Sequence, residues 1–376
     1  MRRTPSPAAA TFAAFASVLS GIGLARFAYT PLLPALIEAG WLSPAGAAWA
    51  GAANLLGYLA GALMGPWITR ARDPRPGLRG MMLLVAVSLA ATALPLGFVW
   101  IALWRAVSGL AGGALAVAGV STAMAAVPPG RHGLGAGLVF TGVGLGVVGS
   151  GVLIPWLLRL GMAEAWLALA GVCLCLALAA WRGWPPEAPS PPPPRAARIF
   201  LPVHVAYAFG AVALVPHMVF LVDHIARGLG WGMAAGALQW VLFGAGATAG
   251  PIAMGLLADR IGFNFATRLV YVVEAVAVLI PALTANVVLL SVSSVLVGAF
   301  TPGIVPLTLG RLHGLGGGAG AWAMATIGFA TIQALAAAGF SVLYGTWGLH
   351  APLFILGAAA LLAGVATDLA LSRRRG

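Results

Sequence analysis

Two arginines lie within long apolar stretches of the sequence, Arg26 and Arg105. A charged side chain at the centre of a bilayer costs about 2.5 to 3.5 kcal/mol on insertion scales, so such residues are rare and need a partner. Arg26 is about 17 residues from the start of its stretch, which places it about 25 Å deep, past the midplane of a hydrocarbon core about 30 Å thick. Its guanidinium either binds an anion or carboxylate in a cavity or forms a structural ion pair.

Arg105 and Glu274 are the residues whose chemistry suits proton coupling. Gly109 and Gly113 follow Arg105 and allow close helix approach, so the arginine charge can modulate the protonation of a nearby acid. Glu274 stands in the middle of an apolar stretch, where burial disfavours the charged carboxylate and keeps a proton available. For both residues the alternative is structural, a fixed pair for Arg105 and a neutral or cross-bundle hydrogen bond for Glu274.

Uncharged polar and aromatic residues at similar depth complete the candidate substrate cavity. Asn54 and Tyr58 are one helical turn apart and share a face, while Tyr29 precedes two prolines that bend a helix. Amides within membrane spans more often form hydrogen bonds between helices than bind substrate, so this structural alternative stays open. With Arg26, the predicted cavity residues are Tyr29, Asn54, Tyr58, His217 and Gln333.

Three titratable residues follow one another near the end of the seventh apolar stretch, His217, Asp223 and His224. Together they have the residue types of a titratable cluster. Asp223 and His224 are nevertheless expected at the boundary with water, as solvated interface residues.

No set of residues indicates catalysis. The six histidines are scattered, no metal-ligand spacing or nucleophile motif is present, and Cys173 and Cys175 are too close in sequence to indicate a disulfide framework. The net charge of +12 comes from arginine alone, placed in short segments between apolar stretches. That placement indicates membrane topology rather than nucleic-acid binding. We therefore expect no enzyme, no cofactor, no metal and no nucleic-acid partner.

The composition shows which solvent surrounds these residues. Of the 376 residues, 61% are hydrophobic and 7% are Asp, Glu, Lys or Arg, whereas an ordinary soluble domain has about 25% charged residues. So few charges cannot solvate a protein surface. The chain is predicted to lie in a lipid bilayer.

Twelve apolar stretches reach the length of about 20 residues that a membrane helix needs. The predicted fold class is an all-α membrane protein with twelve transmembrane helices in two pseudo-symmetric bundles of six. The predicted spans are 9–38, 44–69, 80–98, 99–126, 132–158, 163–182, 199–222, 232–258, 266–284, 287–311, 318–345 and 350–371.

Arginine placement gives the orientation, because loops on the cytoplasmic side are enriched in basic residues. With the N-terminus inside, sixteen of the twenty arginines lie on the cytoplasmic side, and only Arg159 and Arg227 lie outside. Both termini are therefore predicted to be cytoplasmic.

A proline-rich segment divides the spans six and six. We predict an N-terminal bundle over 1–182, a cytoplasmic linker over 183–198 and a C-terminal bundle over 199–376. A shift of 190 residues superposes Gly65 on Gly255 and Arg70 on Arg260, which is typical of parallel repeats.

Two six-helix bundles joined in this way indicate a secondary transporter, whose substrate site lies between the halves near the midplane. We expect alternating-access transport of a small organic solute, with protons as the coupling ion and a preference for anionic substrates. The alternatives are a proton-driven efflux pump for lipophilic compounds or sugars, and a non-transporting membrane sensor or assembly subunit. The expected partners are the small-molecule substrate, protons and the lipid bilayer, and we expect a monomer.

The span count, linker and repeat resemble the major facilitator superfamily over the whole chain. The segment Gly255-Leu-Leu-Ala-Asp259-Arg260-Ile-Gly262 resembles the cytoplasmic loop motif of that superfamily. The resemblance implies that Asp259 and Arg260 help to lock and release the halves during conformational gating. In the first half only Arg70 is retained, because threonine precedes it where the motif has aspartate.

Two further segments narrow the resemblance. Arg105 with Gly109 is similar to the motif that the superfamily associates with proton coupling. The segments Gly21 to Pro34 and Ala53 to Gly61 resemble the bacterial YbfB/YjiJ-type branch, which implies a multi-pass protein of the bacterial inner membrane.

Overall fold

The computed structural model describes residues 5–128, 132–186, 197–317 and 319–373, and this part of the chain is helical with no strand. The chain divides into two compact units, Met1–Ser190 and Pro191–Gly376. The all-α fold class is confirmed. The predicted bounds 1–182, 183–198 and 199–376 stay a prediction, because most of the linker, 187–196, lies outside the described residues.

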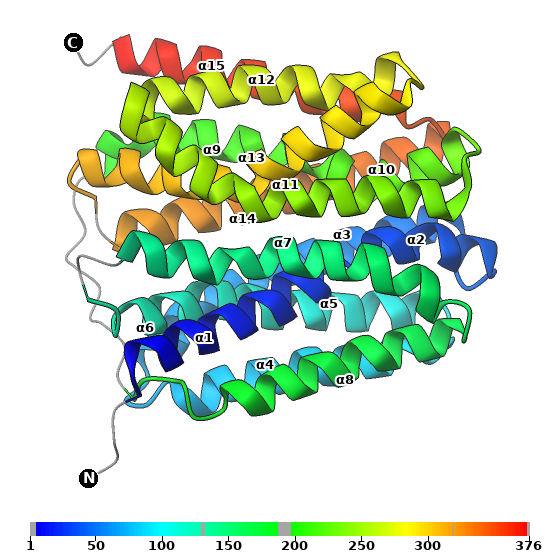
Figure 1. Ribbon diagram of the computed structural model, residues 1–376, viewed down its shortest axis with the longest axis horizontal. Coiled ribbons are helices and arrows are strands. Elements are labelled where there is room, and N and C mark those ends of the chain that lie inside the picture. Colours follow the sequence, from blue (N-terminus) through cyan, green and yellow to red (C-terminus); the bar gives the residue numbers. More distant parts are fainter. Residues whose placement is uncertain (1–4, 129–131, 187–196, 318, 374–376) are drawn as a thin grey trace. The chain divides into compact units, whose positions relative to one another are not determined.

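The N-terminal unit is a bundle of six spans, drawn from blue to green in Figure 1. The first span consists of α1, a π-helical turn η1 and α2, and the fourth consists of α5, a π-helical turn η2 and α6. The bounds are α1 Pro7–Val18, η1 Leu19–Leu24, α2 Tyr29–Glu38, α3 Pro44–Arg70, α4 Arg75–Thr92, α5 Phe98–Ala114, η2 Leu115–Gly119, α6 Val120–Met124, α7 His132–Leu157 and α8 Met162–Ala180.

The C-terminal unit repeats this plan, from green to red in Figure 1. Its first span consists of α9, the π-helical turn η5, the short α10 and a second π-helical turn η6. After the 3₁₀ turn η4 Ala197–Phe200, the bounds are α9 Leu201–Val215, η5 Pro216–Phe220, α10 Leu221–Asp223, η6 His224–Gly228, α11 Gly232–Ile261, α12 Phe263–Leu283, α13 Val287–Gly314, α14 Ala319–Trp347 and α15 Ala351–Arg373.

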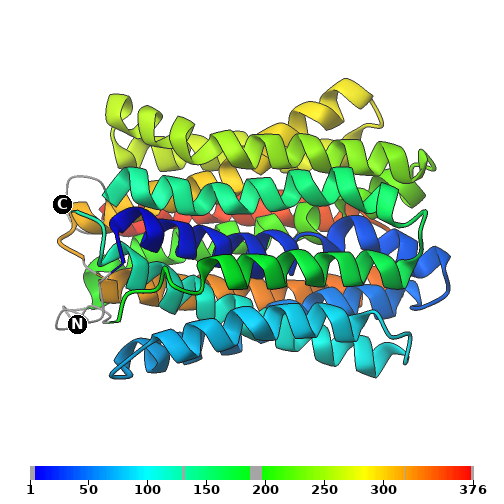
Figure 2. The same ribbon diagram turned by 60° about the horizontal axis from the view of Figure 1, so that its bottom comes forward.

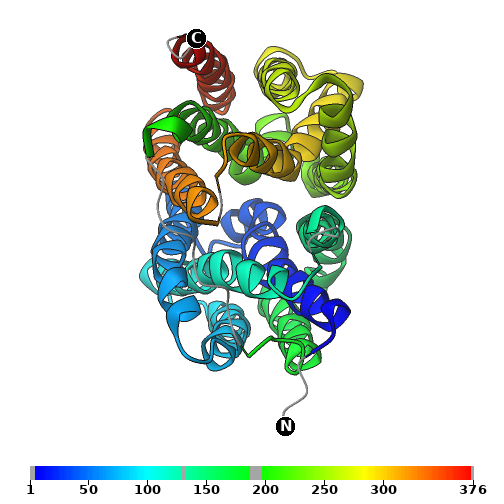
Figure 3. The same ribbon diagram turned by 90° about the vertical axis from the view of Figure 1, so that its left-hand side faces the viewer.

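Length and hydropathy identify the spans in the described chain. Eleven helical segments are long and apolar enough to cross a membrane. The remaining span is α4, 18 residues long, which begins with Arg75 and carries Arg79 one turn later. Figures 1 and 2 show the helices of each unit running side by side, and Figure 3 views them along their axes.

Two spans differ most from the sequence prediction. The third span begins at Arg75 and ends at Thr92, earlier than the predicted 80–98, and a loop separates it from α5. The seventh span runs to Gly228 instead of 222, because Asp223 and His224 are buried inside the unit. The prediction that these two residues are solvated is wrong.

Glycines allow two helices of each unit to approach each other closely. In the N-terminal unit, a Cβ at Gly57, Gly61 or Gly109 would overlap a backbone carbonyl oxygen of the facing helix of the α3–α5 pair. The same holds at Gly246, Gly250 and Gly298 in the α11–α13 pair of the C-terminal unit. Each of these glycines lies 189 residues after its counterpart. The two units therefore share one packing scheme, within one residue of the predicted repeat.

Candidate functional site

Arg26 lies in the first span, in the turn between η1 and α2, and is buried. Its guanidinium carbon is 5.0 Å from the ring centre of Tyr58 on α3 and 5.4 Å from that of Phe27. A guanidinium at this distance from an aromatic face is attracted to it. The two rings thus hold the arginine inside the N-terminal unit.

Arg105 on α5 is almost fully buried, with 1% of its surface exposed. One terminal nitrogen donates to the backbone carbonyl of Ala25, directly after the π-helical turn η1. The guanidinium carbon lies 4.3 Å from the ring centre of Tyr29, whose hydroxyl donates to the Ala47 carbonyl at 2.7 Å. Arg105 therefore binds a backbone carbonyl and an aromatic face, and its Nε has no partner among the described residues.

The interior of the N-terminal unit is positively charged. Arg26 and Arg105 are close enough to interact electrostatically. The described acids of this unit are Glu38 at the end of α2, Asp73 in the α3–α4 loop and Glu164 in the first turn of α8. None of these three carboxylates lies at the depth of the two arginines.

Asn54 joins α3 to α5. Its amide nitrogen donates to the Arg105 carbonyl at 3.0 Å and to the Ser108 hydroxyl at 2.9 Å. These bonds are of the kind that holds membrane helices together, which is the structural alternative for this residue. Its amide oxygen has no partner among the described residues.

His217 lies in η5 of the C-terminal unit and is fully buried. Its Nε2 is 2.9 Å from the Ser293 hydroxyl, which donates to the Ala277 carbonyl at 2.6 Å. The edge of the His217 ring meets Phe354, with the ring centres 5.2 Å apart. Its Nδ1 has no partner in the described part of the chain.

Glu274 and Gln333 are buried in the same unit, on α12 and α14. Glu274 makes no hydrogen bond or ion pair with the residues that the structure describes, and it lies near enough to Tyr271 to interact electrostatically. Both amide atoms of Gln333 likewise have no partner among those residues. Unsatisfied buried polar groups are rare in proteins and call for an explanation.

The gating motif forms the last turn of α11. Gly262 ends the helix with a φ of +81°, a conformation that favours glycine. Asp259 and Arg260 are exposed and form no ion pair with any described residue, and Gly255 faces open space. The side chain of Arg70 lies outside the described residues. The role of the motif in gating stays a prediction.

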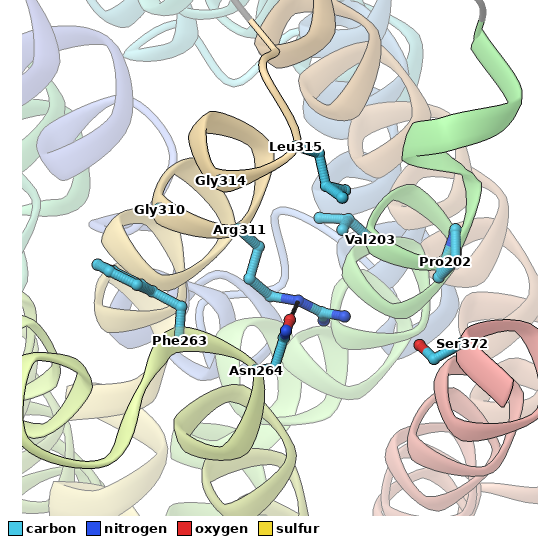
Figure 4. A pocket seen from close by; sticks show the side chains of 9 residues that line it. All are labelled: Pro202, Val203, Phe263, Asn264, Gly310, Arg311, Gly314, Leu315 and Ser372. Atoms are coloured by element: carbon cyan, nitrogen blue, oxygen red, sulfur yellow. Dashed lines mark hydrogen bonds between the residues drawn. The ribbon is translucent and has the colours of Figure 1, made fainter. Parts of the chain in front are cut away.

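A charge network at the predicted cytoplasmic end of the C-terminal unit was not predicted. Asp368, 1% exposed, accepts from Arg311 at 2.5 Å and from Arg268 at 2.7 Å, and Arg311 also donates to Asn264 at 2.8 Å. A cavity of about 370 Å³ lies beside it and includes Ser372 in its lining. Figure 4 shows Arg311 and Asn264 meeting in this cavity. The sequence identified these arginines only as topology signals.

A second cluster lies at the opposite end of the same unit, and the sequence indicated only two of its residues, Asp223 and His224. Asp223 is fully buried and accepts from Arg227, Tyr344 and His350. The spacing of four between Asp223 and Arg227 was a usable signal, since residues four apart in a helix are neighbours. No sequence pattern indicated Tyr344 and His350 as partners, because both are more than 120 residues from Asp223 in sequence.

The sequence profile of one family, described as the uncharacterised MFS-type transporter YbfB, matches residues 18–369. The chain belongs to this family of the major facilitator superfamily. No curated protein matches the chain. The family consists of transporters, so the protein is a multi-pass membrane transporter and not an enzyme.

Solved structures show the same fold. A bacterial homolog of the human lysosomal transporter Spinster, in an inward-facing and occupied conformation, is 14% identical, with a TM-score of 0.70 over 98% of this chain and 96% of that chain. A D-xylose–proton symporter is also 14% identical, with a TM-score of 0.72 over 96% of each chain.

Proposed function

We propose that this transporter is proton-coupled and moves a small organic anion, such as a carboxylate, by alternating access. The observation that carries the proposal is the positive interior of the N-terminal unit. Arg26 and Arg105 are buried there and interact electrostatically, while the described acids of the unit lie at helix ends or in a loop.

A bound anion reduces the repulsion between Arg26 and Arg105. Two like charges buried near each other are unfavourable, and a bound carboxylate supplies the opposite charge. Arginine suits the task because its planar fork of donors matches the two oxygens of a carboxylate. Tyr58 and Phe27 fix the Arg26 guanidinium at 5.0 and 5.4 Å, so little conformational freedom is lost when the anion binds.

Neutral polar groups complete the proposed substrate site. Asn54 and Gln333 each keep an amide oxygen without a partner among the described residues, and His217 keeps Nδ1. Such atoms suit hydrogen bonds to the hydroxyl or amide groups of an organic substrate. Tyr29 and Tyr58 supply aromatic faces.

Proton coupling is assigned to Glu274, with Arg105 as a modulating charge. A buried carboxyl without an ion partner binds and releases a proton at little structural cost, which suits a coupling group. The D-xylose–proton symporter has the same fold and its name records proton coupling, which supports proton coupling here.

The remaining features follow from the predicted topology. We propose a monomer in the bacterial inner membrane with both termini cytoplasmic, as the arginine distribution indicates. Gly255, Asp259, Arg260 and Gly262, with Arg70, serve in conformational gating.

Thermal unfolding of the purified protein in the presence of small organic acids tests the proposal. A ligand that binds only the folded state stabilises it, by about 2.7 kcal/mol at 100 times its Kd. We expect at least one carboxylate to raise the melting temperature of the wild type and to lose this effect in Arg26→Ala. Arg159→Ala is the matched control, because Arg159 is an exposed arginine of the same unit.

Two outcomes would contradict the proposal. If Arg26→Ala responds to the acid as the wild type does, Arg26 is structural. If lipophilic cations stabilise both proteins and no acid does, the protein is an efflux pump for lipophilic compounds.

A further inference from the structure

The Asp223 cluster joins three segments at the predicted outer end of the C-terminal unit. Its carboxylate accepts from the Tyr344 hydroxyl at 2.5 Å, from His350 Nε2 at 2.8 Å and from Arg227 at 3.0 Å. Asp223 belongs to α10, Tyr344 to α14, and His350 to the turn before α15. None of these residues has a place in the proposed substrate site.

Two histidine rings lie beside each other in this cluster. The ring centres of His224 and His350 are 5.1 Å apart. His224 is 7% exposed, and neither of its ring nitrogens forms a hydrogen bond with a described residue. The Pro281 carbonyl of α12 lies near this ring but outside hydrogen-bond geometry. A buried neutral imidazole whose nitrogens form no hydrogen bond can accept a proton on its unprotonated nitrogen.

Gly228 shows where the free nitrogens point. A Cβ at Gly228 would lie 3.0 Å from His350 Nδ1 and 3.1 Å from His224 Nδ1. The two Nδ1 atoms therefore converge on the same space, which stays open because residue 228 has no side chain. Any other residue at this position would crowd both rings.

The carboxylate fixes the tautomer of His350. An ionised carboxylate only accepts hydrogen bonds, so His350 Nε2 carries the hydrogen that it donates to Asp223. A neutral imidazole has one hydrogen, so Nδ1 of the same ring has a free lone pair. This Nδ1 is the atom that lies 3.0 Å from the position a Cβ would take at Gly228.

The charges of the cluster allow one more proton. Arg227 balances Asp223, so the cluster is neutral while both rings are neutral. One proton on either ring has the Asp223 carboxylate to stabilise it, and a second proton would meet a like charge on the neighbouring ring. Tyr344 faces the cluster from α14, and the ring of Phe354 lies 5.2 Å from that of His217 and 5.4 Å from that of His224.

Exposure decreases from solvent into the cluster. The exposed fraction falls from 29% for the Arg227 side chain to 9% for His350, and then to 0% for Asp223. The carboxylate therefore lies at the buried end of the cluster, and the two rings lie nearer to solvent.

We propose that His224 and His350, the latter oriented by Asp223, form a proton-binding site in which the two rings together bind one proton. The role of this proton as a coupling ion rests on the proposed function. Because Asp223 bonds to α14 and to the turn before α15, proton occupancy changes the charge at the point where these segments meet the seventh span.

Histidine NMR of the full-length protein in a lipid nanodisc tests the site. The chain has only six histidines, so labelled imidazole signals can be assigned with His224→Gln and His350→Gln. Signals are recorded from about pH 4 to pH 9, and we expect the two rings to share one titration, because a proton on one ring disfavours a second proton on its neighbour. Removal of either ring should shift the midpoint of the other by about one pH unit or more, a tenfold change in proton affinity.

Gly228→Ala is the sharpest variant, because it retains every titratable group and adds a methyl group within about 3 Å of both Nδ1 atoms, which crowds the two rings. We expect the shared titration to be lost in this variant. Gly339→Ala is its control, since a Cβ there meets no atom within 4 Å. His204→Gln is the control for loss of a histidine, because His204 bonds to the Ala321 carbonyl away from the cluster.

Independent titration of the two rings overturns the proposal, as does the absence of any titration in this range. Shared titration that survives in Gly228→Ala also overturns it. The measurement needs no substrate, so its failure is distinguishable from that of the proposed function. A shared proton in a protein that binds no organic acid would refute the anion proposal and leave this site in place.

Discussion

The two units bury polar groups of opposite character. In the N-terminal unit Arg26 and Arg105 are buried against aromatic rings and a backbone carbonyl. In the C-terminal unit the buried acids are Asp223 and Asp368, whose basic partners include the buried Arg311, and Glu274, which has no partner among the described residues. Packing is nevertheless shared, since the contact glycines of α3–α5 and α11–α13 recur at one spacing. The two units therefore share their helix contacts but differ in the charged residues that they bury.

The largest expected effect comes from the shared packing. Gly109→Ala and Gly298→Ala each place a methyl group on a backbone carbonyl of the facing helix, which cannot move aside without separating the pair. Overpacking of this kind costs about 3 kcal/mol or more. Thermal unfolding should show a similar loss of stability for both variants.

Gly149→Ala and Gly339→Ala are the matched controls, because a Cβ at either position meets no atom within 4 Å. They should equal the wild type or exceed its stability by up to about 1 kcal/mol, since alanine favours a helix. If Gly109→Ala is destabilising and Gly298→Ala is not, the units do not share one packing scheme.

An effect of comparable size distinguishes the charges of the two units. Asp368→Asn leaves Arg311 buried without its carboxylate, and removal of one partner of a buried pair costs about 3 to 5 kcal/mol. Arg105→Met removes a buried charge that has no carboxylate partner among the described residues. It should cost less than Asp368→Asn, because replacement of a buried ion by an apolar side chain of similar size is often neutral.

The same thermal unfolding series measures both variants, at neutral pH and in the absence of ligand. An equal or greater loss in Arg105→Met would show that the arginine is stabilised as strongly as a paired one. The difference that we describe between the buried charges of the two units would then be wrong.

The smallest effect is expected at Asp73, whose carboxylate bonds to Arg75 at 2.7 and 2.8 Å in an exposed loop. These hydrogen bonds hold the pKa of Asp73 below its ordinary value. A lowered pKa means that the pair contributes stability above about pH 4 and loses it as the pH falls through the lowered value. Water and salt screen an exposed pair, so Asp73→Asn should leave the melting temperature unchanged at neutral pH.

A clear fall in the melting temperature of Asp73→Asn, abolished by high salt, would contradict this expectation. It would show that charge in the N-terminal unit matters to stability at its surface as well as in its interior.

Hydropathy predicted the fold because each span carries its own signal. The spans need only local sequence, and the family match agrees with a membrane transporter. The end of the seventh span was predicted wrongly for a physical reason. Asp223 and His224 have the polarity of an interface, and only the distant Tyr344 and His350 make their burial possible.

The candidate sites were predictable in part. Arg26, Arg105 and Glu274 stood out because a charge in an apolar stretch is visible without a structure. Arg268 and Arg311 did not, since both lie near span ends, where arginine normally marks topology. Their common partner Asp368 is 100 and 57 residues away, and no spacing rule connects residues so far apart.

The π-helical turn η1 sets the register of the first span. A helix of 3.6 residues per turn rotates by about 100° for each residue, so one residue more or less in this turn would swing everything beyond it by that angle. Before the turn ends, Gly21 and Gly23 pack against glycines of α5 and α7, and beyond it lie Arg26 and Tyr29. The one extra residue in this turn therefore lets the same helix pack on the glycines of α5 and α7 and also direct Arg26 toward Tyr58.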